Sequence, residues 1–168
     1  MKNTQIIAAI VEHRPGVLYK VSNLFRRRNF NIESISVGPA EIDGTARMTI
    51  TVSESEQTTE QVIKQLNKLV EVIKVSRLDA SNMVAREMAL VKVHIANPAA
   101  RSDIVQYANI FRSRIVDVSS DSMTVEVTGD SSKIDAFIDL MKGFGIKEIA
   151  RTGITALARG VRSTKLEE

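Results

Sequence analysis

The feature that most constrains the fold is an order of strands and helices that occurs twice along the chain. Apolar residues alternate or recur at helical spacing, so residues 5–78 predict strand, helix, strand, strand, helix, strand. The same order recurs over residues 88–156. Each half is therefore predicted to form a split βαβ unit, the ferredoxin-like arrangement. We expect an α+β protein made of two tandem ferredoxin-like βαββαβ units.

Each predicted element has a sequence signal of its own. The two capping-box pairs, Thr58 with Gln61 and Ser132 with Asp135, predict the starts of the second and fourth helices. The first helix follows Pro15 and the third follows Asn97-Pro98. The strands are expected over residues 5–11, 32–38, 45–53, 72–78, 88–96, 115–119, 123–128 and 146–156.

The domain boundaries follow from the repeat. Residues 1–79 are predicted to form the first domain and residues 87–158 the second. Residues 80–86 lie between two strongly patterned segments and are predicted to be a linker. Residues 159–168 are polar, and we expect them to form a frayed tail.

One edge of the first sheet lacks the charge that usually protects an edge strand. Right-handed crossovers and adjacent hairpins give the strand order 4-1-3-2, which makes strands 2 and 4 the edges. Strand 4 carries Lys74 and Arg77, whereas strand 2 has only Glu33 at its start. We therefore predict a homodimer in which strand 2 meets a second copy. The residues of this dimer edge are Ile32, Ser34, Ile35, Ser36 and Val37.

The turn between the first strand and the first helix is the candidate binding site. Pro15 and Gly16 stand at the start of the helix, where unpaired N–H groups and the helix dipole attract an anion. Asn31 precedes the second strand, and its amide can hold an ammonium group. Together these groups predict a site for a free amino acid. Glycine in a cramped turn and asparagine beside a strand also have purely structural explanations.

The composition excludes several classes of function. The chain has 168 residues, a net charge of +3 and no cysteine, which excludes thiolate chemistry and disulfides. Its two histidines, His13 and His94, lack metal-site spacing, and no nucleophile elbow or phosphate loop is present. We therefore expect no catalytic residue, metal or cofactor. With no apolar run of about 18 residues and no room for a signal peptide, we expect a cytoplasmic protein without a membrane span.

Nucleic acid is not an expected partner either. RNA-binding units of this topology stack bases on strand aromatics. Here aromatic residues make up 4% of the chain, and they fall on or beside predicted helices. The sequence also lacks a helix-turn-helix pattern. These observations leave a small-molecule-binding or protein-binding role.

Six sequence blocks resemble a known family. Residues 12–35 are similar to ACT domains, which sense amino acids, and residues 3–160 resemble the small regulatory subunits of acetohydroxyacid synthase (acetolactate synthase). The blocks are Pro15-Gly16-Val17-Leu18, Asn31-Ile32-Glu33-Ser34, Arg47-Met48-Thr49-Ile50, Gln65-Leu66-Asn67-Lys68-Leu69, Arg86-Glu87-Met88-Ala89-Leu90-Val91-Lys92-Val93 and Arg151-Thr152-Gly153.

The resemblance implies a specific role. Such subunits are not catalytic alone; they bind a catalytic subunit that carries thiamine diphosphate, Mg²⁺ and FAD, raise its activity and confer feedback inhibition by valine. The resemblance places valine, or leucine or isoleucine, at the seam of an ACT dimer, with Asn31 contributed by the other chain and Gly38 bordering the side-chain pocket. The expected effector-binding residues are His13, Arg14, Pro15, Gly16, Val17, Leu18, Asn31, Ile32 and Gly38.

Two other functions remain open from the sequence. One is a free-standing amino-acid-sensing ACT module that regulates another enzyme or a transcription factor, and the other is a small ferredoxin-like enzyme. The second unit has Asn97-Pro98-Ala99 where the first has its glycine turn. We therefore expect the second unit to contact the catalytic subunit rather than to bind a second valine.

Overall fold

The computed structural model describes residues 4–160, and these form two compact units. The first contains residues 4–85 together with residues 153–160, and the second contains residues 86–152. This boundary differs from the predicted domains, because the end of the predicted second domain clusters with the first unit. Each unit is described by itself below.

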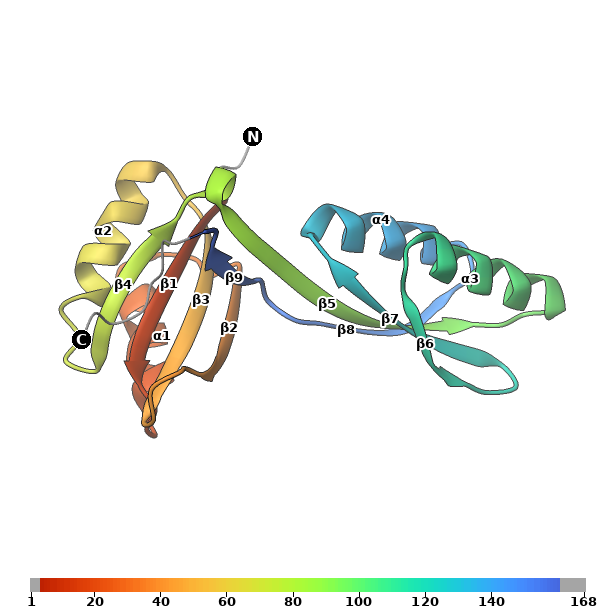
Figure 1. Cartoon of the computed structure of the whole chain (residues 1–168), viewed down its shortest axis with the longest axis horizontal. Coiled ribbons are helices and arrows are strands. Elements are labelled where there is room, and N and C mark those ends of the chain that lie inside the picture. Colours follow the sequence, from red (N-terminus) through yellow and green to blue (C-terminus); the bar gives the residue numbers. More distant parts are fainter. Residues whose placement is uncertain (1–3, 161–168) are drawn as a thin grey trace. The chain divides into compact units, whose positions relative to one another are not determined.

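The first unit is a four-stranded antiparallel sheet with two helices on one face (Figure 1). Its strand order, β2-β3-β1-β4, is the predicted one. The elements are β1 (Thr4–Glu12), α1 (Val17–Arg27), β2 (Ser34–Pro39), β3 (Thr45–Ser53), α2 (Glu56–Leu66), β4 (Val72–Leu78) and the short helix η1 (Ala80–Asn82).

The core of the first unit lies between the sheet and the two helices. Ile7 and Val11 of β1 are fully buried there, and Val21 and Phe25 of α1 and Leu66 of α2 pack against them. Val17, Val21 and Phe25, which recur at helical spacing, form the buried face of α1, whereas Leu18 is 47% exposed. The start of α2 differs from the prediction, because Ser55 and not Thr58 caps the helix by accepting the backbone N–H of Thr58 at 3.1 Å.

The opposite face of this sheet, which no helix of the unit covers, forms a second small core. Ile6, Ala8 and Leu78 project there and are at most 6% exposed. They are covered by residues that return from the far end of the chain, chiefly Ala156 of β9 (Thr155–Ala158). The predicted strand over residues 146–156 is thus two strands, and residues 152–154 between them carry the chain from one unit to the other.

The returning segment rests directly on the edge strand β2. A Cβ atom at Gly153 would lie 2.8 Å from the carbonyl oxygen of Ile35 and 3.1 Å from its nitrogen. Ser34 Oγ accepts the backbone N–H of Ile154 at 3.4 Å, and the hydroxyls of Ser36 and Thr155 are hydrogen-bonded at 3.0 Å. A side chain at position 153 would overlap the backbone of Ile35, so only glycine fits there.

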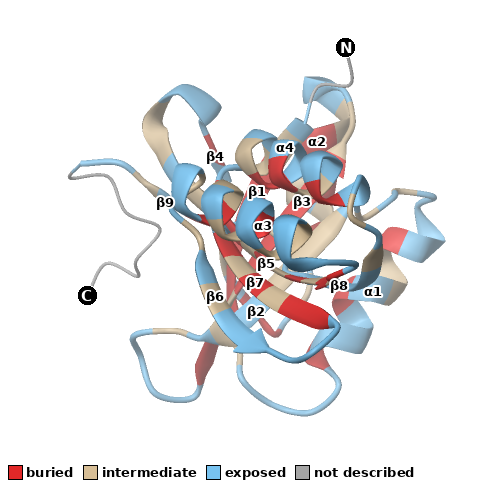
Figure 2. Cartoon of the chain, turned by 90° about the vertical axis from the view of Figure 1, so that its right-hand side faces the viewer, coloured by how far each residue is buried: buried red, intermediate tan, exposed pale blue. Residues whose placement is uncertain are grey.

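The second unit repeats the order with strands arranged β6-β7-β5-β8. Figure 2 shows buried residues along its central strands β5 and β7 and exposed residues on the outer side of α3. The elements are β5 (Met83–His94), α3 (Pro98–Ile110), β6 (Arg114–Val118), β7 (Ser122–Gly129), α4 (Ser131–Lys142) and β8 (Ile146–Arg151). The predicted linker 80–86 is occupied by η1 and the start of β5. Asp130, rather than Ser132, caps α4.

Two of the sequence blocks from the second half meet in this unit. Arg151 Nε donates to Glu87 Oε2 at 2.6 Å, and Glu87 is only 7% exposed. The backbone N–H of Met88 donates to Thr152 Oγ1, and the N–H of Thr152 donates to the carbonyl of Met88, both at 3.0 Å. Charge-assisted and backbone bonds together therefore fix where β8 ends and where the chain turns back toward the first unit.

We expect Gly153→Ala to lower the free energy of unfolding by about 1–3 kcal/mol, since the new methyl group must displace the backbone of Ile35. Gly38→Ala is the matched control, because a Cβ at Gly38 of the same edge strand meets no atom within 4 Å. Chemical denaturation of both variants measures the difference. Equal stability of the two would show that the returning segment does not press on β2.

Candidate functional site

The predicted turn lies between β1 and α1, and most of it is exposed. Residues 13–16 are all exposed, whereas Val17 is 4% exposed and belongs to the core. Only the backbone of Val17 is therefore available to a ligand. Leu18, by contrast, is 47% exposed on the first turn of the helix.

Gly16 is the N-cap of α1 and adopts a left-handed conformation, with φ of +88°. No side chain caps this helix, and the space around Gly16 is open, since a Cβ there would meet no atom within 4 Å. The N–H of Val17 makes only a long bond of 3.5 Å to the carbonyl of Arg14. The structure thus satisfies both explanations of Gly16: the turn requires glycine, and the helix start is open to an anion.

A buried carboxylate that the sequence analysis did not single out supports the turn. Glu71, which precedes β4, is 6% exposed and accepts hydrogen bonds from Lys20 and Arg14. Arg14 also pairs with Glu12 at the end of β1. Arg14 is therefore held by carboxylates of its own chain. The hydrogen bond from Lys20 is the main reason that the pKa of Glu71 lies below its ordinary value.

Asn31 lies just before β2, is exposed, and donates from Nδ2 to Glu33 Oε1 at 3.1 Å. Ile32 is half-buried and packs against the core. Gly38, near the other end of β2, has open space beside it. The amide of Asn31 is thus at the surface, oriented by a neighbouring carboxylate that can also attract a cation.

Within one chain, Asn31 and Gly16 lie far apart. Asn31 precedes the start of β2, whereas Gly16 follows β1, whose last residues are in register with the end of β2. Ser34 aligns with Thr51 and Ile6, near the start of β1, whereas Pro39 aligns with Ala46 and Val11, next to the turn. A strand of six residues spans about 20 Å. One copy of the chain therefore cannot place both groups on a single amino acid, which sequence spacing alone did not reveal.

The corresponding turn of the second unit is closed. Asn97 Oδ1 accepts the backbone N–H of Ala100 at 2.8 Å, so the start of α3 is capped by its own side chain. The start of α3 is thus capped by a side chain, whereas the start of α1 at Gly16 is not.

Residues 4–160 contain no cluster of three or more histidine or acidic side chains that could hold a metal ion. Over the same range, no helix is long and apolar enough to cross a membrane. The edge strand β2 pairs only with β3 within the described chain, and Val37 on it is 45% exposed.

Comparison with known proteins places this architecture among ACT domains. Residues 7–74 match the family model described as the AHAS small subunit-like ACT domain, and residues 86–160 match that of the small subunit of acetolactate synthase. A probable acetolactate synthase small subunit of Methanothermobacter thermautotrophicus is 58% identical over 161 residues, covering 96% of each chain. The acetolactate synthase small subunit of Bacillus subtilis is 48% identical over 159 residues, covering 94% of this chain and 92% of the relative.

A solved structure agrees with the sequence comparison. The acetolactate synthase small subunit from Thermotoga maritima superimposes with a TM-score of 0.89 at 45% identity, covering 94% of this chain and 98% of that one. The first unit is therefore an ACT-type domain. The chain as a whole belongs to the family of acetolactate synthase small subunits.

Glu71→Gln is expected to destabilise the protein at neutral pH, because it removes the charge that holds Lys20 and Arg14. The pKa of Glu71 is lowered by folding, so its contribution is fully present above pH 4.5, its ordinary pKa, and is lost as the pH falls below that value. Denaturant unfolding at several pH values should show the wild-type advantage shrinking on acidification. Glu148→Gln, on an exposed glutamate of β8, is the control and should show no such loss.

Proposed function

We propose that this chain is the regulatory subunit of acetolactate synthase. It binds the catalytic subunit, raises its activity and makes it sensitive to feedback inhibition by valine. The membership of the family supports the partner, since a small subunit of an enzyme acts with a larger one. Thiamine diphosphate, Mg²⁺ and FAD are assigned to the catalytic subunit and not to this chain.

The separation of Gly16 from Asn31 is the observation that carries the effector site. A two-fold axis beside the outer edge of β2, perpendicular to the sheet, aligns two copies of this strand in antiparallel directions. The Asn31 end of one copy then lies beside the Gly16 turn of the other. Each of two equivalent sites combines an uncapped helix start for the carboxylate with an amide for the ammonium group.

The exposed residues of the first unit suit such a pairing. Within the sheet, the outer edge of β2 is unoccupied, and the segment that crosses β2 lies over the face to which Ser34 and Ser36 point. Val37 on the strand and Leu18 and Tyr19 on α1 are 45%, 47% and 71% exposed. Apolar side chains next to a free strand edge favour association with a second copy.

Regulation then follows from linkage. Valine binds at the seam and stabilises the dimer arrangement that it fits best. If that arrangement activates the catalytic subunit less, valine inhibits the complex. If it also binds the catalytic subunit less tightly, the catalytic subunit weakens the binding of valine by the same factor, because reciprocity holds for affinities. No chemistry by this chain is needed for the effect.

The first experiment is calorimetric titration of the full chain with valine. Asn31→Ala should weaken binding by about 1–3 kcal/mol, as expected for losing a hydrogen bond to a charged group. Asn109→Ala, at an exposed asparagine on α3, is the matched control and should bind as the wild type does. Unchanged binding by Asn31→Ala would contradict the site. No binding of valine, leucine or isoleucine by the chain, alone or with the catalytic subunit, would contradict the sensing role.

A mixing experiment tests whether the site is shared between two copies. Gly16→Val and Asn31→Ala variants each damage both sites of their own homodimer. After the two are denatured, mixed and refolded together, half of the dimers are mixed, and each mixed dimer regains one intact site. Binding should therefore return to about a quarter of the sites. If the mixture binds no better than either variant, each site lies within a single chain.

A further inference from the structure

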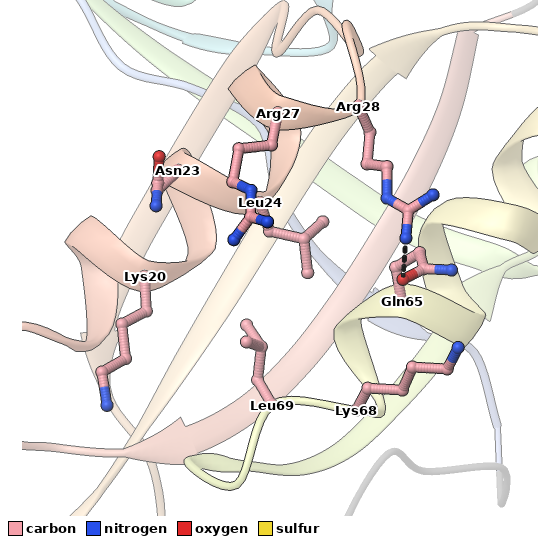
Figure 3. Close-up of a pocket in the computed structure, with 8 residues that line it drawn as sticks. All are labelled: Lys20, Asn23, Leu24, Arg27, Arg28, Gln65, Lys68 and Leu69. Carbon is pink, nitrogen blue, oxygen red and sulfur yellow. Dashed lines mark hydrogen bonds between the residues drawn. The ribbon is translucent and has the colours of Figure 1, made fainter.

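A cluster of positive charge borders a cavity between the two helices of the first unit. A cavity of 510 Å³ opens between α1 and α2. Its lining contains four cations, two amides and two leucines (Figure 3). These residues, called here the helix groove, are Lys20, Asn23, Leu24, Arg27, Arg28, Gln65, Lys68 and Leu69.

The lining of the helix groove contains no carboxylate, and its cations are mostly not neutralised. Arg28 donates to the neutral Gln65 Oε1 at 3.1 Å. Lys20 is paired with Glu71, which lies outside the lining. Within residues 4–160, Arg27 and Lys68 make no ion pair. Three positive charges thus border one cavity without an acidic partner, although like charges at this spacing repel.

Helix dipoles explain only part of this arrangement. Cations are favoured near helix C-termini, which accounts for Arg27 and Arg28 and for Lys68 taken one at a time. The helix dipoles do not account for the grouping of these cations around Leu24 and Leu69. Figure 3 shows Leu24 and Leu69 pointing toward one another at the centre of the groove. Both side chains are partly buried and pack against the core of the first unit.

We propose that the helix groove binds a small polyanion, a metabolite with two or more phosphate or carboxylate groups. Arginine pairs with such oxyanions through two parallel hydrogen bonds, and lysine adds a mobile point charge. The volume lies within the range of small-molecule sites. No aromatic side chain lines the groove, so it offers no platform for stacking a base. The carbon skeleton of the ligand rests on Leu24 and Leu69.

The helix groove and the proposed valine site are lined by different residues, although Lys20 of the groove pairs with Glu71, which also holds Arg14 of the turn. A ligand in the groove touches both α1 and the end of α2, and α1 begins at Gly16. The two ligands can therefore be tested separately on the same protein.

The test is calorimetric titration of the full chain with tripolyphosphate and with citrate, at low and physiological ionic strength. Tripolyphosphate represents phosphate ligands and citrate represents polycarboxylates. The probe that binds more tightly therefore shows which of these two classes of anion the groove prefers. Arg27→Gln/Lys68→Gln should weaken binding about tenfold or more, because charge-assisted bonds are lost. Arg26→Gln/Lys64→Gln removes the same charge from the same helical segments outside the lining and should change affinity less than twofold.

The results that overturn the proposal are equally specific. Equal weakening by both double variants would mean that only the overall charge matters. If neither tripolyphosphate nor citrate binds, the proposal that the groove is a polyanion site is wrong. Tighter binding of an acidic peptide than of both probes would assign the groove to a protein segment instead. Chemical shifts of the Leu24 and Leu69 methyl groups give an independent reading, since they should move with the polyanions and not with valine.

Discussion

The first sheet has two apolar faces, and its own two helices can cover only one of them. Ile6, Ala8 and Leu78 project from the other face, and the first 85 residues cover them only in part, through Met83 and Ala85. Residues 153–158 complete the cover, with Ala156 buried at the centre and Arg47 donating to the Ala156 carbonyl at 2.8 Å. Burial lowers the pKa of Arg47 below its ordinary value.

The repeat made most of the fold predictable. Topology rules predict the strand order of the first sheet, and the second sheet repeats it. The continuous apolar run of β1 is buried on both faces of its sheet. The same reasoning failed where a local pattern has a distant cause. The sequence predicts one strand over residues 146–156, yet the chain leaves the second sheet after Arg151, where Thr152 bonds to Met88 and Gly153 lies against the backbone of Ile35.

The candidate site was predictable as a set of residues but not as a geometry. Gly16 and Asn31 stand out in the sequence because of their residue types, and the structure places each where a head group can be reached. The distance between them follows only from the strand register, which places Asn31 near the start of β2 and the Gly16 turn near the level of its end. Glu71 had no sequence signal, since a glutamate beside a strand is usually exposed. Its burial depends on Lys20 of α1 and Arg14 of the preceding turn, which are distant from it in the sequence.

The returning segment also sets the order in which the molecule can be completed during synthesis. The second unit is a continuous stretch, residues 86–152, so it can close as soon as those residues have left the ribosome. The first unit is synthesised earlier, but the cover of its second face stays incomplete until residues 153–158 emerge. The unit that is synthesised first is therefore completed last. Until then, part of its second apolar face is exposed to solvent, and exposed apolar surface makes a nascent chain prone to aggregation.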